Sequence, residues 1–516
     1  MNSAIILLDR AAEKYGDKIG YEDEWESIGF SRLREKAMVI GTRLLREIES
    51  DGTVSPVIVY MPKSVKCVVS YMGILYSGNP YVPIDNNMPL IRLQKIINSL
   101  KPGAIITDEA HIENLAEIDL GRAEKYLYED ISQGEADASL IEKKIQGVID
   151  TDPIYIMYTS GSTGEPKGGT ISHRGVIDYA KWAVGTFSFD EDTVMASQAP
   201  FYFDNSVFEI YGCLVCGGKM VIIPEVLMMF SLKLPEFLEE HKINTIFWVP
   251  TVMINIANSG VLSKYKLPSL KTVAFCGEIM PNKQLNIWRK EYPHCLYANL
   301  YGPMEITDVC SYYIVDRTFK DSEPLPIGRA CKNTRIIILN EKDQIAEVGE
   351  IGELCVIGSG VGLGYWGDRE ATEKAFVQNP VNPYFNEKIY RTGDLAYIDG
   401  EGLIMFVGRK DSQIKLRGNR IELGEVEKAA ACIDDVKRAC AIFHVEQEKI
   451  VLFLETAEEF TLRKVNTELS RYVPRYMLPQ RLITMEKFPH TANDKIDRIT
   501  LREKYLEEKQ EREDGD

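Results

Sequence analysis

The sequence predicts an α/β protein whose sheets are mostly parallel, arranged in layers and covered by helices. Short continuous apolar runs at 57–61 and 103–107 are typical of strands that are buried on both faces. Across residues 33–45, apolar side chains recur at helical spacing between charged ones, as in a helix that packs one face on a core. Strand-like and helix-like segments alternate along the chain, which favours parallel strands joined by helices.

Length, charge and cysteine usage limit the classes of function. A chain of 516 residues is too long for one core and allows about two to four domains. Its net charge of −17 argues against general affinity for nucleic acid or anionic membranes. No apolar run approaches the roughly 20 residues of a membrane span, and the run at 4–8 is too short for a secretory signal, so we expect a cytoplasmic protein. The 10 cysteines lie mostly in apolar contexts, which favours reduced thiols over disulfides or zinc.

A loop rich in glycine and hydroxyl groups at 158–168 is the strongest local signal. It follows the apolar run 154–157 and precedes a helical pattern that begins near Ser172. Glycines let backbone N–H groups approach an anion, the hydroxyls add donors and Lys167 adds a positive charge, so the loop is suited to phosphate. It is not a Walker loop, because Pro166 interrupts the chain directly before the lysine. The alternative is a flexible linker of small residues.

Polar or small residues follow several later strand-like runs, in the segments 201–206, 246–251, 273–278 and 299–305. In open α/β sheets, ligands bind beyond the carboxyl ends of the strands, so these segments are candidates for a site. Each also has a structural explanation. Asp204 is equally consistent with a helix N-cap, Cys276 and Tyr301 with core positions, and Glu305 with an acid in the first turn of a helix.

Taken together, the motifs resemble the adenylate-forming superfamily, which comprises acyl- and aryl-CoA synthetases, luciferases and amino-acid adenylation domains. The resemblance covers nearly the whole chain and rests on the order and spacing of segments 158–168, 299–305, 390–394, 408–418 and 493–498. Within the superfamily, the chain is most similar to stand-alone amino-acid adenylation domains of the D-alanine:carrier-protein ligase type. The segments that point there are 80–85, 198–201 and 275–278.

The resemblance implies a division of the chain into two domains. An N-terminal adenylation core, residues 1–410, would hold the ATP and substrate sites and include a small β-barrel-like subdomain. A small mobile α+β domain, residues 411–516, would turn about a hinge at Asp411, a polar position between two strand-like segments. One orientation would present Lys495 for adenylation, and the other would present the segment 415–420 for thioester formation.

The same resemblance implies an ATP site with Mg²⁺. The catalytic residues would be Lys495, Lys167, Thr163 and Glu305, with Glu305 as the Mg²⁺ ligand, since a carboxylate is the hard oxygen ligand that this ion prefers. The departing phosphates would be held by Thr159, Ser160, Gly161, Ser162, Thr163, Gly164 and Lys167. Tyr301 would stack on adenine beside Asn299, Gly302 and the backbone near Gly277 and Glu278. Asp394 would accept bonds from both ribose hydroxyls, and Arg409 would contact ribose or phosphate.

For the acid substrate, the resemblance matches Asp204 to the carboxylate that pairs with the α-ammonium of an amino acid. The remaining pocket positions are Asn205, Phe208, Phe247, Ala274, Cys276, Leu300, Asp308 and Val309. Asp308 departs from the D-alanine ligases, which carry a small apolar residue there. Either the substrate has a second polar group or Asp308 turns outward to solvent. Met304 and Asp494 also depart, from a usual threonine and a usual glycine, but neither change removes a charged catalytic group.

The expected function is therefore ATP-dependent activation of D-alanine, or of another small or polar amino acid, as the aminoacyl-AMP. Transfer to the phosphopantetheine thiol of a carrier protein would follow, and no carrier domain is visible in the sequence, so we expect a separate carrier. One alternative is a carboxylate:CoA ligase that acts on an aryl or small organic acid. Another is a non-catalytic nucleotide-binding descendant, which would have no use for Lys495.

Overall fold

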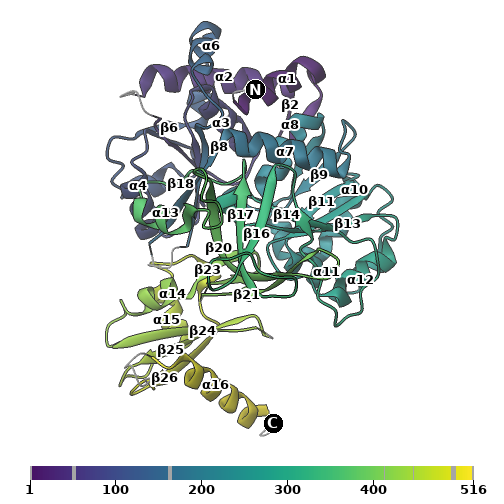
Figure 1. Ribbon diagram of the computed structural model, residues 1–516. Coiled ribbons are helices and arrows are strands. Elements are labelled where there is room, and N and C mark those ends of the chain that lie inside the picture. The colour runs from purple at the N-terminus through teal and green to yellow at the C-terminus, as the bar shows by residue number, and fades with distance from the viewer. Residues whose placement is uncertain are drawn as a thin grey trace. The chain divides into compact units, whose positions relative to one another are not determined.

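The structure is a computed structural model that describes residues 3–48, 54–160, 165–411, 413–445, 447–489 and 496–513 (Figure 1). The chain forms two compact units. The first contains the residues up to Asn86 together with Ile97–Tyr158 and Lys167–Lys410. The second contains Asn87–Ile96, Thr159–Pro166 and the residues from Asp411 onward. Part of the predicted phosphate loop is therefore grouped with the C-terminal residues.

A nine-stranded sheet carries most of the predicted substrate positions. Its strands lie in the order β15-β14-β13-β12-β11-β9-β10-β1-β2, and the pairings from β13 through β1 are parallel. The bounds are β1 Ile19–Glu22, β2 Ser27–Gly29, β9 Val194–Ser197, β10 Lys219–Ile222, β11 Thr245–Trp248, β12 Thr272–Cys276, β13 Leu296–Tyr301, β14 Ser311–Ile314 and β15 Arg329–Ala330. This arrangement confirms the mostly parallel sheet that the sequence predicts.

A seven-stranded sheet forms a second layer and contains the strands on both sides of the predicted phosphate loop. Its order is β18-β8-β7-β4-β3-β5-β6. The bounds are β3 Val57–Tyr60, β4 Tyr81–Pro83, β5 Ala104–Thr107, β6 Glu124–Leu127, β7 Pro153–Thr159, β8 Lys167–Ser172 and β18 Gly364–Tyr365. The apolar runs predicted as buried strands correspond to β3 and β5, every residue of which is buried.

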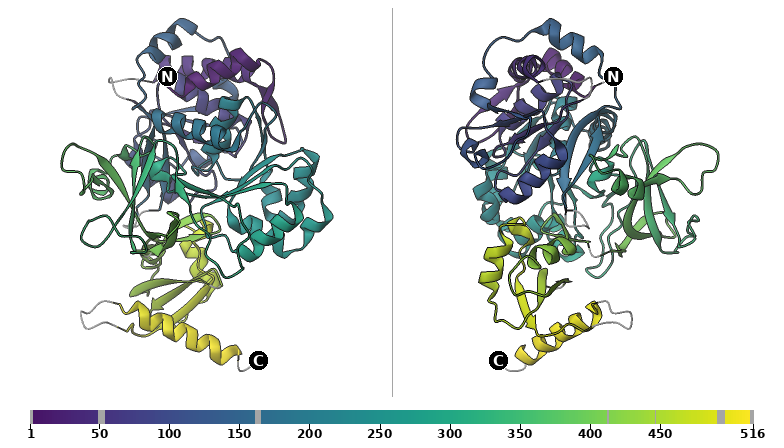
Figure 2. Two further views of the ribbon diagram at one scale, coloured as in Figure 1. Left: turned by 45° about the vertical axis from the view of Figure 1, so that its right-hand side comes forward. Right: turned by 90° about the vertical axis from the view of Figure 1, so that its left-hand side faces the viewer.

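Helices fill the space between these sheets and cover their outer faces (Figure 2). The helices that contribute to the largest cluster of buried side chains are α1 Ile5–Tyr15, α2 Phe30–Glu47, α3 Val65–Tyr76, α5 Tyr128–Ile131, α6 Ala138–Gln146, α7 His173–Phe187 and α8 Ser206–Cys216. A second cluster on the other face of β11–β13 is covered by α10 Leu234–Glu240, α11 Pro250–Asn258 and α12 Asn282–Glu291. The predicted helical stripe at 33–45 lies in α2, and the helix expected near Ser172 is α7, with Ser172 as its N-cap.

A five-stranded antiparallel sheet completes the first unit. It has the order β16-β17-β20-β19, with β21 also paired to β20. The bounds are β16 Thr334–Leu339, β17 Gly352–Gly358, β19 Phe376–Gln378, β20 Lys388–Ile398 and β21 Ile404–Arg409, with helix α13 Arg369–Ala375 before β19. The long strand β20 carries Asp394, and β21 carries Arg409.

The second unit has its own small core. It contains the hairpin β22 Gln413–Leu416 and β23 Asn419–Glu422, and a sheet of β24 Arg438–His444, β25 Lys449–Glu455 and β26 Arg481–Met485. Its helices are α14 Leu423–Ala430, α15 Leu462–Leu469 and α16 Arg498–Glu513, and the segment 87–96 adds the first turns of α4 Leu90–Leu100. Arg92 forms a buried ion pair with Glu425 of α14, and their side chains are 4% and 5% exposed. Helix α16 continues to Glu513.

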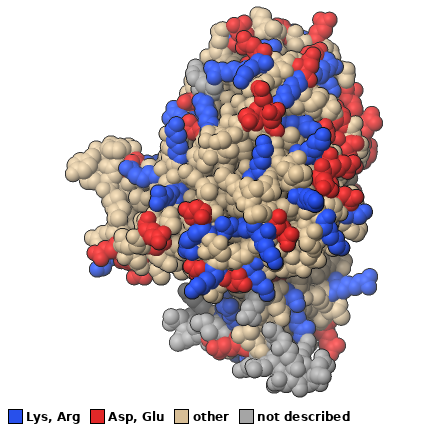
Figure 3. All heavy atoms as spheres, turned by 90° about the vertical axis from the view of Figure 1, so that its right-hand side faces the viewer, with Lys and Arg blue, Asp and Glu red and all other residues tan. Residues whose placement is uncertain are grey.

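The cysteines are reduced, and side chains of both charges share the face drawn in Figure 3. All ten cysteines are free thiols, which confirms the expectation from their contexts. On the face drawn in Figure 3, lysine and arginine side chains are interspersed with acidic ones, so the negative net charge does not form a uniform field there. Within the described part of the chain, none of the helices is both long and apolar enough to span a bilayer.

Candidate functional site

The pleat of three neighbouring strands brings four predicted pocket residues onto one face. Ile246, Val273 and Tyr297 point into the cluster under α11 and α12, while Phe247 and Ala274 point to the opposite face, into the cluster between the sheets. Cys276 and Leu300 point the same way. Phe247 pairs in register with Ala274, and Cys276 pairs with Leu300. Because side chains alternate along a strand, these four positions form a single patch at the carboxyl ends of β11, β12 and β13.

Aromatic rings from the helices close this patch. The ring of Phe208, on α8, lies 4.6 Å from that of Phe247 and 6.3 Å from that of Tyr179, on α7. Tyr179 in turn stacks on Trp182 at 5.7 Å. Val309 is buried in the same cluster. Rings from α7 and α8 therefore pack over this face of the sheet.

Asp308 lies inside this buried region. It is 1% exposed, and its carboxylate accepts a hydrogen bond from the hydroxyl of Tyr179. The alternative that Asp308 turns outward to solvent is therefore wrong. The residue has a left-handed backbone with φ of 68°, a conformation that aspartate tolerates better than most residues.

The negative charge of Asp204 raises the pKa of the same two tyrosines as that of Asp308. The pKa of Tyr155 and that of Tyr179 are both raised well above 10, first by burial and then by the negative charges of these two aspartates. The two carboxylates are thus within electrostatic range of both hydroxyls. Helix α8 begins at Ser206, and Asn205 occupies its N-cap position. The alternative that Asp204 is the N-cap is therefore wrong.

The residues predicted to bind adenosine meet across the sheets. The hydroxyl of Tyr301, at the end of β13, donates to one carboxylate oxygen of Asp394. Arg409 donates to the other at 2.9 Å and to the carbonyl of Thr392 at 3.1 Å. Asp394 and Arg409 are also register partners on β20 and β21. An aromatic ring, a carboxylate and a guanidinium therefore converge from β13, β20 and β21.

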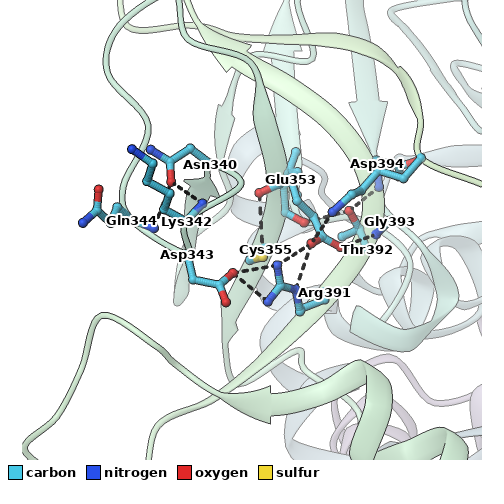
Figure 4. Close-up of polar contacts among 12 residues, drawn as sticks. Asn340, Lys342, Asp343, Gln344, Glu353, Cys355, Arg391, Thr392, Gly393 and Asp394 are labelled. Carbon is cyan, nitrogen blue, oxygen red and sulfur yellow. Dashed lines mark hydrogen bonds and ion pairs between the residues drawn. The ribbon is translucent and has the colours of Figure 1, made fainter.

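A buried glutamate holds the turn that precedes Asp394 (Figure 4). Glu353, on β17, accepts a hydrogen bond from the backbone N–H of Gly393 at 3.1 Å and pairs with Arg391 at 2.7 Å. Arg391 also reaches Asp343 at 3.0 Å. The ammonium of Lys410, the last residue of the first unit, lies 3.3 Å from Glu353. Glu353 therefore fixes both the approach to Asp394 and the residue before the predicted hinge.

The predicted adenine-edge residues follow β12 and lie on β13. The side-chain amide of Asn299 donates to the carbonyl of Pro326 at 2.8 Å. Glu278 accepts from both the backbone N–H and the hydroxyl of Thr251, at 3.0 and 2.7 Å. Gly277 adopts φ of 101°, a conformation that favours glycine. Gly302 lacks the Cβ that would lie 2.1 Å from the backbone oxygen of Asp308, so only glycine allows that approach.

Two predicted phosphate and metal residues are connected by Tyr365. Its hydroxyl donates to Glu305 at 2.8 Å, and the ammonium of Lys167 lies 5.4 Å from the centre of its ring. Glu305 is 1% exposed. Met304, the residue that replaces threonine, packs against Gly169 of β8, where an added Cβ would lie 2.1 Å from its methyl carbon. The lysine and the carboxylate thus sit beside one aromatic ring.

The remaining loop residues belong to the second unit or lie outside the described residues. The hydroxyl of Ser160 donates to the carbonyl of Arg420 at 2.9 Å, and Glu165 lies 3.1 Å from both Lys95 and Lys428. Thr159 is the last residue of β7. The predicted residues Gly161, Ser162, Thr163, Gly164 and Lys495 lie outside the described residues, as does Asp494.

Four residues that the sequence did not single out are central to this geometry: Tyr155, Tyr179, Tyr365 and Glu353. Tyr155 and Tyr365 lie on strands and Tyr179 on a helix, each among apolar neighbours that look like core. The hydroxyls of Tyr179 and Tyr365 donate to acids far away in the chain, at separations of 129 residues for Tyr179 and Asp308 and 60 for Tyr365 and Glu305. The only local signal was a tyrosine within an otherwise apolar segment, which is equally common in structural cores.

Comparison with known proteins gives a consistent result. A family model described as AMP-binding enzyme matches residues 8–366. The D-alanine--D-alanyl carrier protein ligase of Bacillus licheniformis is 31% identical, over 97% of this chain and 99% of that protein. Tyrocidine synthase 1 of Brevibacillus parabrevis is 30% identical over 97% of this chain and 45% of that protein.

Solved structures share the fold. The Vibrio cholerae adenylation domain AlmE, in complex with glycyl-adenosine-5'-phosphate, has a TM-score of 0.81 at 20% identity over 98% of each chain. IdnL1 has a TM-score of 0.80 at 24% identity over 95% of this chain and 99% of that one. At these identities, the likeness concerns the fold alone, and it confirms the predicted fold class.

Proposed function

Because the chain belongs to the AMP-binding enzyme family and is an AMP-forming ligase, we propose that it activates an amino acid with ATP and passes the aminoacyl group to a separate carrier protein. The acceptor would be the phosphopantetheine thiol of that carrier, as the names of the D-alanyl carrier protein ligases suggest. The proposal calls for neither nucleic acid nor membrane insertion and places the reaction in the cytoplasm.

One observation carries the proposal. Leu300 and Tyr301 are consecutive residues of β13, and consecutive side chains of a strand point to opposite faces. Leu300 belongs to the patch with Cys276, while Tyr301 bonds to Asp394. An acid on one side of this strand end and a nucleotide on the other would be neighbours, which is the proximity that transfer between two bound reactants needs.

In the first half-reaction, a carboxylate oxygen of the amino acid attacks the α-phosphorus of ATP. The bond to the β-phosphate breaks, so aminoacyl-AMP and pyrophosphate form. Asp204 would orient the substrate by pairing with its α-ammonium. Tyr301 would stack on adenine, and Asp394 would accept the ribose hydroxyls, since a carboxylate has acceptor sites beyond those used by Tyr301 and Arg409.

Charge on the departing phosphates would be met by Lys167 and by Mg²⁺ at Glu305. Among the described residues, no group of three or more metal-binding side chains converges. A single buried carboxylate fits Mg²⁺, which is commonly held by one or two carboxylates together with substrate phosphates. When bound, the ion would neutralise phosphate charge, while Tyr365 holds Glu305 in place through its hydrogen bond.

In the second half-reaction, the carrier thiol attacks the acyl carbonyl, so that a thioester forms and AMP leaves. We propose that residues 1–410 form the adenylation core and that residues 411–516 turn about Asp411 between the two steps. Lys495 would contact the reacting carboxylate in the first step. The segment 415–420, which includes the hairpin between β22 and β23, would serve the second.

The test is ATP–pyrophosphate exchange dependent on an amino acid, followed by transfer to a carrier. Lys495→Ala should abolish exchange while leaving ATP binding largely intact, whereas the exposed Lys487→Ala in the same unit serves as a control and should not. If exchange persisted in Lys495→Ala, the role proposed for this lysine in adenylation would be wrong. Asp204→Ala should raise KM for the amino acid far more than KM for ATP.

The alternative function is distinguished by the acceptor and the acid. Exchange with an aryl or small organic acid, together with thioester formation on free CoA, would favour a carboxylate:CoA ligase. An amino acid as substrate and a carrier protein as acceptor would support the proposal.

A further inference from the structure

Asp394, the residue proposed to bind the ribose hydroxyls, lies in a bulge of β20. Glu353 of β17 pairs in register with Leu395, and Cys355 pairs with Arg391, so β20 has more residues than β17 between these two pairs. The extra residues leave the regular ladder and include Asp394. Bulges are frequent beside active sites, where they change the direction of a side chain.

The backbone of this bulge is bonded to β17. Gly393, at its centre, has φ of 74°, a conformation that favours glycine. Its N–H donates to one carboxylate oxygen of Glu353 at 3.1 Å. The N–H of Asp394 donates to the hydroxyl of Thr392 at 3.0 Å, and this hydroxyl donates to the carbonyl of Leu354 at 2.7 Å. The backbone that orients Asp394 therefore depends on two contacts with β17.

Lys410, directly after β21, bonds to the same bulge. Its backbone N–H donates to the carbonyl of Gly393 at 2.9 Å, and its ammonium lies 3.3 Å from the second carboxylate oxygen of Glu353. That oxygen also accepts a hydrogen bond from the guanidinium of Arg391 at 2.8 Å (Figure 4). Gly393 is thus held through both its N–H and its C=O, and Glu353 uses both of its oxygens.

Arg391 does not depend on Glu353 alone. Asp343 accepts hydrogen bonds from both terminal nitrogens of Arg391, each at 3.0 Å, so the arginine has a second carboxylate. The contact with the N–H of Gly393 has no such substitute among the carboxylates of this cluster. A glutamine in place of Glu353 would turn an NH₂ group toward one of the donors, because an amide has only one acceptor oxygen.

We propose, building on the proposed function, that Glu353 is a positioning residue for the nucleotide. By holding Gly393, it directs Asp394 toward the ribose and gives the site its preference for a sugar that carries both hydroxyls. Asp394 already accepts hydrogen bonds from Tyr301 and Arg409, so the acceptor sites left for ribose have set directions. A shift of the backbone at Gly393 would displace them, and binding groups must be held to within about 0.5 Å.

A purely structural role for Glu353 leads to a different result. Loss of sheet stability would lower the melting temperature and weaken the binding of every nucleotide alike. Loss of positioning at Asp394 would weaken only those nucleotides whose ribose hydroxyls it binds. The ratio of the affinities for ATP and for 2′,3′-dideoxy-ATP, which lacks both hydroxyls, therefore separates the two roles.

The experiment is isothermal titration calorimetry of the full chain with each of these nucleotides and Mg²⁺. Wild type should bind ATP about 10-fold or more tightly than the dideoxy nucleotide, because hydrogen bonds to a charged group have effects of that order. In Glu353→Gln, the ratio should fall to about 3-fold or less, through weaker binding of ATP. A ratio that stays at the wild-type value in Glu353→Gln overturns the inference alone. Equal binding of both nucleotides by wild type contradicts the role of Asp394 in the proposed function.

Two further variants complete the test. Glu353→Asp keeps the charge beside Arg391 but is one methylene shorter, so it should also lose the affinity ratio, and it carries the test if Glu353→Gln fails to fold. Glu373→Gln is the matched control, because it removes a carboxylate bonded to an arginine on α13 where both side chains are exposed. The control should keep the wild-type ratio and melting temperature. A folded Glu353→Asp with the wild-type ratio, or a control that loses the ratio, overturns the inference.

Discussion

Glu209, on α8, should make the stability of the first unit fall as the pH rises. It is 1% exposed; one carboxylate oxygen lies 3.5 Å from the hydroxyl of Ser197, and the other makes no hydrogen bond within the described residues. Burial raises its pKa from 4.5 to about 8, opposed by the nearby Lys63. Lys63 donates to the carbonyl of Ser197 at 2.7 Å, and burial lowers its own pKa from 10.5 to about 8.

The sign and size follow from proton linkage. Because the pKa of Glu209 is raised on folding, its contribution to stability is complete below pH 4.5 and is lost as the pH rises through about 8. One proton held by the folded state alone gives a slope of about 1.4 kcal/mol per pH unit. Between pH 5.5 and 7.5, this group alone should lower the free energy of unfolding by about 2 to 3 kcal/mol. Lys63 acts in the opposite sense above pH 8, because its lowered pKa makes stability rise with pH there.

The assay uses Glu209→Gln, which keeps the shape of the side chain and cannot titrate. All five tryptophans lie in the first unit, so their fluorescence during urea unfolding follows that unit alone. Relative to that of wild type, the free energy of unfolding of Glu209→Gln should rise by about 2 to 3 kcal/mol as the pH increases from 5.5 to 7.5. For an m-value near 3 kcal/mol/M, this difference corresponds to about 1 M in the urea midpoint. The exposed Glu13→Gln on α1 is the control and should keep the wild-type slope. A Glu209→Gln protein whose stability falls with pH as steeply as wild type would refute the reasoning.

Two further predictions concern single contacts. Glu425→Gln should destabilise the second unit by about 3 to 5 kcal/mol, because it leaves Arg92 buried without its charged partner; hydrogen exchange of β24 and β25 measures this, and unchanged protection would count against it. Gly302→Ala should lower kcat/KM in pyrophosphate exchange about 100-fold in a folded protein, because the added Cβ collides with the backbone of Asp308. Gly185→Ala, in α7 with no atom within 4 Å of the new Cβ, is the matched control and should be neutral or stabilising.

Local patterns predicted the strands, whereas the pocket positions came from the resemblance to adenylate-forming enzymes. Among those positions, the structure puts Phe247, Ala274, Cys276 and Leu300 on one face, as the strand period requires once the strands are placed. The buried position of Asp308 could not be chosen from the sequence, because it depends on a hydroxyl 129 residues away.

The same limit applies to the nucleotide side. The positions of Asp394 and Arg409 were predicted from motifs, and their pairing follows from the register of β20 and β21. The roles of Tyr365 and Glu353 come from contacts between strands that are distant in sequence, as in the 60-residue separation of Tyr365 and Glu305. No periodicity encodes such contacts, since they arise only when the sheets are assembled.

The alternation at the end of β13 has an evolutionary consequence. With the acid and the nucleotide bound as proposed, the end of this strand would lie between them, so substitutions at Leu300 or at its neighbours Cys276 and Ala274 would change the choice of acid without disturbing the residues that would hold ATP. In such a protein, a few substitutions can change the preferred acid while the use of ATP stays the same. A library restricted to those positions should therefore yield enzymes that differ in the acid they activate and share one KM for ATP.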